Sequence, residues 1–280
     1  MTTEQYRKQW LRFHKIYERR AFNILRKMFK QITLDLPFDE LTEQNYPSKI
    51  ELSVKQNTFI NAYWRLYTTI GLLHGTRVGR SIDKDIKDFS LDLFQNNFRF
   101  KIYNWILENA GFRITSVRAE YIEYIKQLIA NGLQDGKTIR EISKEIVKLV
   151  RRRSFYGWQA MRIARTETTA AANQGAVLAG ESSGIVWNKI WISALDNRTR
   201  RHPDDKFDHR EMHEVQVRKE DYFKLTAIDK NGSYDEYIEF PGAPITRAGN
   251  QTSAGNVINC RCTVSVIAAR DSNGRIIRRI

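Results

Sequence analysis

The chain has 280 residues with the composition of a folded protein. Hydrophobic residues make up 41% and aromatic residues 11%, which is enough to build a core and excludes wholesale disorder. Two cysteines exclude a disulfide scaffold, and five prolines with 15 glycines exclude a collagen-like fibre. No apolar run approaches the ~20 residues of a membrane span, and no apolar segment of a secretory signal follows the basic N-terminus. We therefore expect a soluble protein made in the cytoplasm.

The charge is strongly positive and comes in blocks. Lys and Arg number 46 against 32 Asp and Glu, a formal net charge of +14, which favours nucleic acid, an acidic protein or an anionic membrane as a partner. Positions 148–165 carry six cations and no acid. A solvated basic helix end is one explanation of this block. The other, which we predict, is sequence-independent binding of double-stranded DNA through Lys148, Arg151, Arg152, Arg153 and Arg162.

Helical periodicity dominates the first two-thirds of the chain. The first helix covers residues 1–30, where apolar side chains recur every three or four positions: Tyr6, Trp10, Phe13, Tyr17, Ala21, Ile24 and Met28. A second helix is expected at 48–74, ended by Gly75, and a third at 81–110 with a break near its middle. Residues 158–180 form a helix rich in Ala and Gly, which we expect to be buried against its neighbours.

The periodicity changes to that of strands near Gly184. Residues 186–194 alternate between two faces, and 257–267 is a second strand candidate. A short strand or helix is expected at 215–225, and 226–256 is predicted to be mostly loop. The predicted fold class is α+β, with mainly helical N-terminal two-thirds and a small C-terminal sheet-containing domain with long loops.

These elements predict two domains and a tail. Residues 1–110 form a helical region, and residues 111–269 form a second domain. Within the second domain we expect helices over 114–180 and a small α+β part over 185–269. Residues 270–280 are a basic tail that we expect to fray.

The C-terminal part carries the candidate metal ligands. Cys260 and Cys262 are two positions apart, so on a strand their thiols lie on one side. A zinc ion would need two more ligands, for which His202 and His209 are candidates, but Cys-X-Cys is not a common zinc spacing. We therefore favour two small buried thiols and no metal. Asp196 beside these residues leaves a metal-dependent nuclease open.

Several short segments of the C-terminal half stand out: Ile163–Thr168 (IARTET), Trp191–Arg200 (WISALDNRTR), His209–Met212 (HREM), Pro241–Pro244 (PGAP) and Ile258–Cys262 (INCRC). Together they resemble one protein family, the Mu F-like head morphogenesis domain of phage minor head proteins. The resemblance covers about residues 115–266, with His202 or His209 at the family's histidine.

The resemblance implies a minor head (minor capsid) protein of a tailed phage. Such a protein acts in capsid assembly, associates with the portal, and lies inside the virion close to packaged DNA. The N-terminal helices would then dock on the portal, capsid or scaffolding proteins, with no membrane contact during assembly and no cofactor. Two alternatives stay open: a metal-dependent nuclease or toxin-like effector, and a DNA-binding protein outside the virion.

The motif residues are expected to converge where the small-residue helix meets the two strands. We predict a structural rather than a catalytic cluster, because no triad or metal-ligand spacing is present. Its expected ion pairs join Arg165 or Arg198 to Glu167 or Asp196. The full set is Arg165, Thr166, Glu167, Asp196, Arg198, Arg200, His209, Asn259, Cys260, Arg261 and Cys262.

Overall fold

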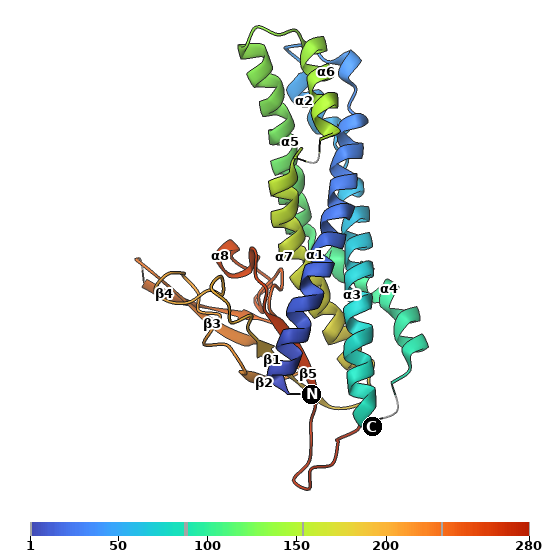
Figure 1. Ribbon diagram of the computed structural model, residues 1–280, viewed down its shortest axis with the longest axis vertical. Coiled ribbons are helices and arrows are strands. Elements are labelled where there is room, and N and C mark those ends of the chain that lie inside the picture. The colour runs from blue at the N-terminus through green and yellow to red at the C-terminus, as the bar shows by residue number, and fades with distance from the viewer. Residues whose placement is uncertain (1, 87–88, 153, 231, 280) are drawn as a thin grey trace.

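The computed structural model describes residues 2–86, 89–152, 154–230 and 232–279. Long helices run side by side in a column, and a small β region lies against one side of its lower part (Figure 1). The α+β class, with the helices mostly N-terminal, is confirmed. The helices are α1 (Thr3–Leu34), α2 (Tyr46–Ser53), α3 (Gln56–Ile86), α4 (Leu91–Asn109), α5 (Gly111–Gln134), α6 (Ile139–Val150), α7 (Gly157–Glu181) and α8 (Ala254–Val257). The strands are β1 (Trp187–Ile192), β2 (Gln216–Arg218), β3 (Phe223–Asp229), β4 (Gly232–Ile238) and β5 (Thr263–Ala268).

The first helix, α1, begins at a capping box. The Thr2 hydroxyl accepts a hydrogen bond from the Gln5 backbone N–H (3.2 Å), and the Gln5 side chain accepts one from the Thr2 N–H (3.0 Å). The predicted apolar stripe faces the core along the whole helix. Trp10, Tyr17, Ala21 and Met28 are buried, and Tyr6, Phe13 and Ile24 are half-buried.

Helices α3 and α7 touch along a line of small residues. A Cβ atom on Gly175 would lie 2.1 Å from the carbonyl oxygen of Gly71, and one on Gly75 would lie 2.5 Å from that of Gly175. Only glycine allows the two backbones to come this close. Gly75 therefore does not end a helix at residue 74, as the sequence had suggested, because it serves this contact. As expected, α7 is buried continuously from Thr166 to Gly180.

The other predicted helix boundaries differ in two places. The helix expected at 48–74 is divided, since α2 ends at Ser53 and α3 begins at Gln56. The region expected as one helix at 81–110 is divided between α3, which ends at Ile86, and α4, which begins at Leu91. The break therefore does not lie near the middle of this region, where α4 is continuous. The rings of Phe94 and Phe98 in α4 are one turn apart and pack against the glycines of α3. The Phe-rich segment that suggested a break in the helix therefore forms one buried helix face.

A three-stranded antiparallel sheet has the order β2-β1-β5. Trp187 pairs with Ala268 and Ile192 with Thr263, so β1 and β5 match over their full length. This sheet packs on the end of α7, where a Cβ on Gly180 would lie 2.8 Å from the Trp187 ring. The strand expected at 186–194 is confirmed, whereas within 257–267 the strand begins only at Thr263.

A second sheet is the hairpin of β3 and β4, in a region expected to be mostly loop. Phe223 pairs with Ile238 at its open end. Phe223, Leu225 and Ala227 are buried in alternation with exposed neighbours. This period-two pattern was present in the sequence, but the polar composition of the second strand obscured it.

The N-terminal helices and the C-terminal domain share one hydrophobic core. In the first turns of α1, Tyr6 donates to the Val264 carbonyl (3.0 Å) and Trp10 Nε1 donates to the Arg261 carbonyl (2.7 Å). The segments predicted as 1–110 and 111–269 are therefore interlocked in space. Residues 270–279 of the tail, which was expected to fray, bond back to the segment before β1; for example, the Val186 N–H donates to the Ile277 carbonyl (2.9 Å).

Candidate functional site

Glu167 lies on the face of α7 that is turned toward α3 and α5. The Tyr67 hydroxyl donates to its carboxylate (2.7 Å), and Arg113 Nη1 lies 3.6 Å away. Arg113 also donates to the Gly242 carbonyl (3.0 Å). Burial, followed by the charge of Glu167, raises the pKa of Tyr67 well above its usual value, so the phenol stays a donor. The predicted pairing of Glu167 with Arg165 or Arg198 is therefore wrong, because α5 supplies its arginine.

A cavity of about 210 Å³ opens beside this pair, between α5, α7 and α8. An ion pair between Arg162 and Glu120 (2.7 Å) lies on its lining. Its volume is below the ~300 Å³ at which ligand pockets begin. Glu167 is held by Tyr67 and Arg113, so its carboxylate is occupied by internal contacts. This cavity does not support the nuclease alternative.

Arg165 turns from α7 toward α1, where it meets Glu18. Its Nε lies 3.7 Å from Glu18 Oε1, and that oxygen lies 3.4 Å from His14 Nδ1. Burial, and then the charge of Arg261, lowers the pKa of His14 to about 3, so its ring is neutral at physiological pH. Burial raises the pKa of Glu18 against the pull of the arginines around it. The contact between His14 and Glu18 therefore involves a neutral imidazole and is not a full ion pair.

Asp196 follows β1 and is held by Arg261 from the segment before β5. Nη1 and Nη2 of Arg261 each donate to the carboxylate, and the Arg198 backbone N–H adds a third hydrogen bond (3.0 Å). Burial alone would raise the pKa of Asp196, but the donors outweigh it and lower the pKa to about 2. Asp196 and Arg261 therefore form a bidentate pair that fixes two loops to each other.

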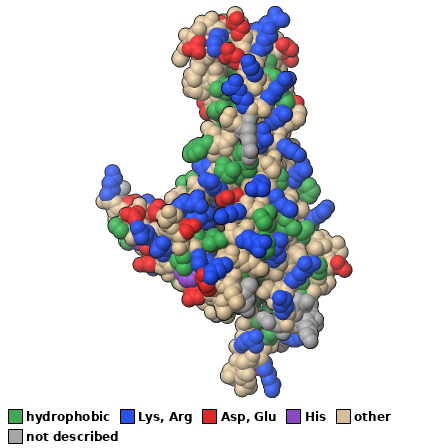
Figure 2. Space-filling view, in the orientation of Figure 1, with side chains coloured by type: hydrophobic (Ala, Val, Ile, Leu, Met, Phe, Trp, Pro, Cys, Tyr) green, Lys and Arg blue, Asp and Glu red, His purple; other side chains and the backbone are tan. Residues whose placement is uncertain are grey.

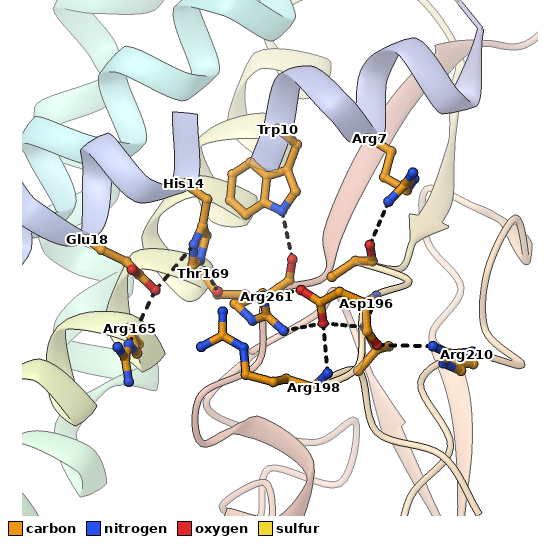
Figure 3. A network of polar contacts seen from close by, with 12 residues as sticks. Arg7, Trp10, His14, Glu18, Arg165, Thr169, Asp196, Arg198, Arg210 and Arg261 are labelled. Atoms are coloured by element: carbon orange, nitrogen blue, oxygen red, sulfur yellow. Dashed lines mark hydrogen bonds and ion pairs between the residues drawn. The ribbon is translucent and has the colours of Figure 1, made fainter. Parts of the chain in front are cut away.

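Three motif arginines surround the contact of α1 with these loops (Figure 3). The charges of Arg165, Arg261 and Arg198 all act on Glu18. The expected convergence of the motif is thus found for these residues together with Asp196, while Glu167 lies on the other face of α7. The Arg198 side chain is exposed, and Figure 3 marks a bond only from its backbone.

The loop before β5 is held to α7 by hydrogen bonds. Asn259 has a left-handed backbone (φ +57°), which asparagine tolerates, and its N–H donates to the Thr166 hydroxyl (3.1 Å). Arg200 donates to the Ile258 carbonyl. Asn173 accepts from the Val264 N–H (3.0 Å) and donates to the Pro241 carbonyl (2.7 Å). One buried amide thus holds two segments of the C-terminal domain.

His209, Cys260 and Cys262 come together in the core of this domain. His209 Nδ1 lies 3.6 Å from the Cys260 sulfur and 3.7 Å from the Cys262 sulfur. A hydrogen bond from Cys262 lowers the pKa of the Cys260 thiol, and burial raises that of Cys262. Among the described residues these three form the one group placed to hold a metal ion. His202 lies apart, bonded to the Asp205 carbonyl (3.0 Å).

The cations predicted to bind DNA fall into two groups. Lys148, Arg151 and Arg152 are exposed where α6 ends. Arg162 is paired with Glu120 and lies over the Trp158 ring (5.0 Å), so it is less available. Arg153 lies outside the described residues. Lys and Arg side chains cover much of the column face shown in Figure 2.

A comparison with protein families matches residues 123–265 to the model described as Phage Mu protein F like protein. The match covers just over half of the chain. The chain belongs to the Mu F-like family. It is therefore a phage head-related protein. Neither the curated proteins nor the solved structures gave a match.

The Mu F-like region contains all the motif residues and ends within β5. Arg113, Tyr67 and His14, which hold its buried groups, lie outside the matched range. These three residues and Asn173 were not predicted from the sequence. The available signal was local: Arg113 and Asn173 are polar residues at apolar-face positions of helices, where they require buried partners. In the described part of the chain, no helix has both the length and the apolarity to cross a bilayer.

Proposed function

We propose that the protein is a minor head protein that acts in phage head assembly, associated with the portal and close to packaged DNA inside the capsid. The observation that carries this proposal is the Mu F-like match over residues 123–265. The internal pairing of its charged motif residues adds support. Glu167 is held by Tyr67 and Arg113, and Asp196 by Arg261. Such pairing suits a scaffold better than a hydrolytic centre, where a base must face an open pocket.

We place the portal contact on the outer face of α4. This helix lies outside α3 in the lower part of the column (Figure 1). Leu93, Phe100 and Leu107 are exposed at intervals of seven residues, which puts them on one face. Phe100 is 70% exposed, which is costly for a large apolar side chain unless a partner covers it. An apolar helix face of this kind fits a groove on another protein.

The test is co-purification from infected cells of the tagged full-length protein with the portal. We expect the portal to accompany the wild-type chain and the Leu52→Ser variant, in which an equally exposed apolar residue outside α4 is changed. Phe100→Ser should lower the recovered portal about tenfold or more, because loss of an anchor side chain costs about 2 kcal/mol or more. Failure of the wild-type chain to recover any portal would overturn the proposal.

DNA binding is proposed for the exposed cations at the end of α6. Because phosphate contacts release counterions, the logarithm of the binding constant should fall linearly with the logarithm of salt concentration. Replacing Lys148, Arg151 and Arg152 by Ala should flatten that slope by about three units, one for each lost phosphate contact. Arg162→Ala is the matched control from the same block, since its side chain is paired with Glu120. A flat salt dependence of the unmodified protein would contradict DNA binding.

A further inference from the structure

Three potential metal ligands face one another beside Trp191, whose ring makes a T-shaped contact with the His209 ring (5.3 Å between centroids). His209 Nδ1 is 3.6 Å from Cys260 Sγ and 3.7 Å from Cys262 Sγ, and the three donor atoms all lie within 4.8 Å of one another. In a tetrahedral zinc site, bonds of ~2.3 Å to sulfur and ~2.0 Å to nitrogen give a nitrogen–sulfur separation of about 3.5 Å. The two measured separations match this value.

The histidine is oriented for metal binding by an amide and a carboxylate. Asn256 Nδ2 donates to Glu236 Oε2 (2.9 Å), which turns the amide oxygen toward the His209 ring. His209 Nε2–H then donates to that oxygen (2.9 Å). Nδ1 is therefore left without a proton, and its lone pair points at the two sulfurs. A ligand histidine whose other nitrogen is bound in this way is the usual arrangement around zinc.

The backbone holds the two cysteines in place. The Thr169 hydroxyl donates to the Cys260 carbonyl, and Asn173 Nδ2 donates to the Cys262 carbonyl (3.3 Å). The left-handed turn at Asn259 directly precedes them. All of these contacts come from α7 or from the loop itself. The ligand positions are therefore set by the fold.

A cation satisfies this site better than hydrogen bonds alone. Three atoms with lone pairs meet in a space where His209 is 1% exposed and each cysteine 2%. Hydrogen bonds can join them only in pairs, whereas a central ion contacts all three. Two thiolates and a divalent ion carry no net charge, which reduces the cost of burial. Thiolate ligands select zinc over hard cations.

We propose that His209, Cys260 and Cys262 bind a zinc ion through Nδ1 and the two sulfurs. A water molecule would take the fourth position, because the described residues supply three ligands. The ion would join the loop that carries His209 to the segment that leads into β5. This assignment goes beyond the proposed function and does not rest on it.

The test is elemental analysis of the full-length protein, purified without a metal-affinity step. We expect about one zinc ion per chain, lost in Cys260→Ser and in Cys262→Ser. His202→Ala is the matched control, because this partly exposed histidine lies outside the cluster and should leave the zinc content unchanged. Asn256→Ala should weaken zinc affinity about 10–100-fold while leaving all three ligands present.

A second measurement covers the case in which the cysteine variants fail to fold. Cobalt added to the metal-free wild-type protein should give the thiolate charge-transfer absorption and the intense visible bands of a tetrahedral site. Added zinc should also protect both thiols from alkylation. A folded wild-type chain that binds neither zinc nor cobalt, and whose thiols react equally with and without zinc, would overturn the proposal.

Discussion

Helix α7 presents unlike surfaces to α3 and to β5. Toward α3 it presents glycine and alanine, and the backbones of Gly71 and Gly175 are in direct contact. Toward β5 and the adjoining loops it presents Thr166, Thr169 and Asn173, whose side chains bond to backbone groups. The first surface is sensitive to added volume, and the second to the loss of single polar groups.

A third kind of contact lies close to the α3 surface, where Glu167 and Arg113 form a buried ion pair. This pair is sensitive both to changes of volume and to the loss of a polar partner, because its side chains are large and charged. The Asp196–Arg261 pair differs from it, since the Asp196 side chain is 34% exposed. Loss of an Arg–carboxylate pair should therefore lower the stability more at the buried Glu167–Arg113 pair than at the Asp196–Arg261 pair.

The largest effect is expected for Arg113→Ala. This change leaves the Glu167 carboxylate buried without its cation, which should lower the free energy of unfolding by about 3–5 kcal/mol. Arg162→Ala, which removes the half-exposed partner of Glu120, should cost about 1 kcal/mol or less. Chemical denaturation of both variants measures the difference. Equal losses would show that burial does not set the strength of these pairs.

Asn173→Ala should come next. It leaves the Val264 N–H and the Thr263 hydroxyl without their acceptor in a buried site. Each buried donor left unpaired costs about 1–3 kcal/mol, so we expect a loss of about 2–4 kcal/mol. Hydrogen exchange should show the loss first at β5. Unchanged protection of β5 amides would mean that the sheet does not depend on α7 for its position.

Gly175→Ala should cost about 1–3 kcal/mol, because its Cβ would meet the Gly71 carbonyl and the helices would have to separate. Gly157→Ala, at the start of the same helix, has no atom within 4 Å of the new Cβ and is the matched control. Thermal unfolding compares the two. If Gly175→Ala destabilises the protein no more than Gly157→Ala does, the close approach of α3 and α7 at Gly175 does not limit the size of this residue.

The smallest effect concerns the pH dependence of the partly exposed Asp196–Arg261 pair. The pKa of Asp196 is lowered to about 2, below its unfolded value of ~3.9, so the pair stabilises the fold above about pH 4. As the pH falls from 4 toward 2, Asp196 is protonated and the stabilisation is lost. The full shift corresponds to about 2–3 kcal/mol, and solvent screening should reduce this. The stability difference between wild type and Asp196→Asn should therefore shrink over this pH range; a constant difference would contradict the assignment.

The helices were predictable because their signals are local. The stripe of α1 and the small residues of α7 are read from periods of three to four positions. The errors arose where tertiary contacts decide. Gly75 looks like a helix end in sequence, yet it lies mid-helix against Gly175. The hairpin of β3 and β4 was missed because the second strand is polar and largely exposed.

The pairing within the candidate site was not predictable from the sequence, and the membership of the site stays a prediction. Two of its predicted residues, Asp196 and Arg261, pair with each other. Which cation meets which acid depends on helices more than 50 positions away, as with Arg113 and Glu167. The zinc hypothesis shows the same limit. The spacing of Cys260 and Cys262 is uninformative until folding brings His209 to them.

We propose that the motif residues hold the Mu F-like region together rather than perform chemistry. Measuring the unfolding free energy of Glu167→Gln and Arg198→Ala tests it most directly. Glu167→Gln should lose about 3–5 kcal/mol by leaving Arg113 unpaired, while Arg198→Ala should stay within about 0.5 kcal/mol because its side chain is exposed. Unchanged stability of Glu167→Gln together with failed phage assembly would contradict the claim, because Glu167 would then act on a partner or substrate.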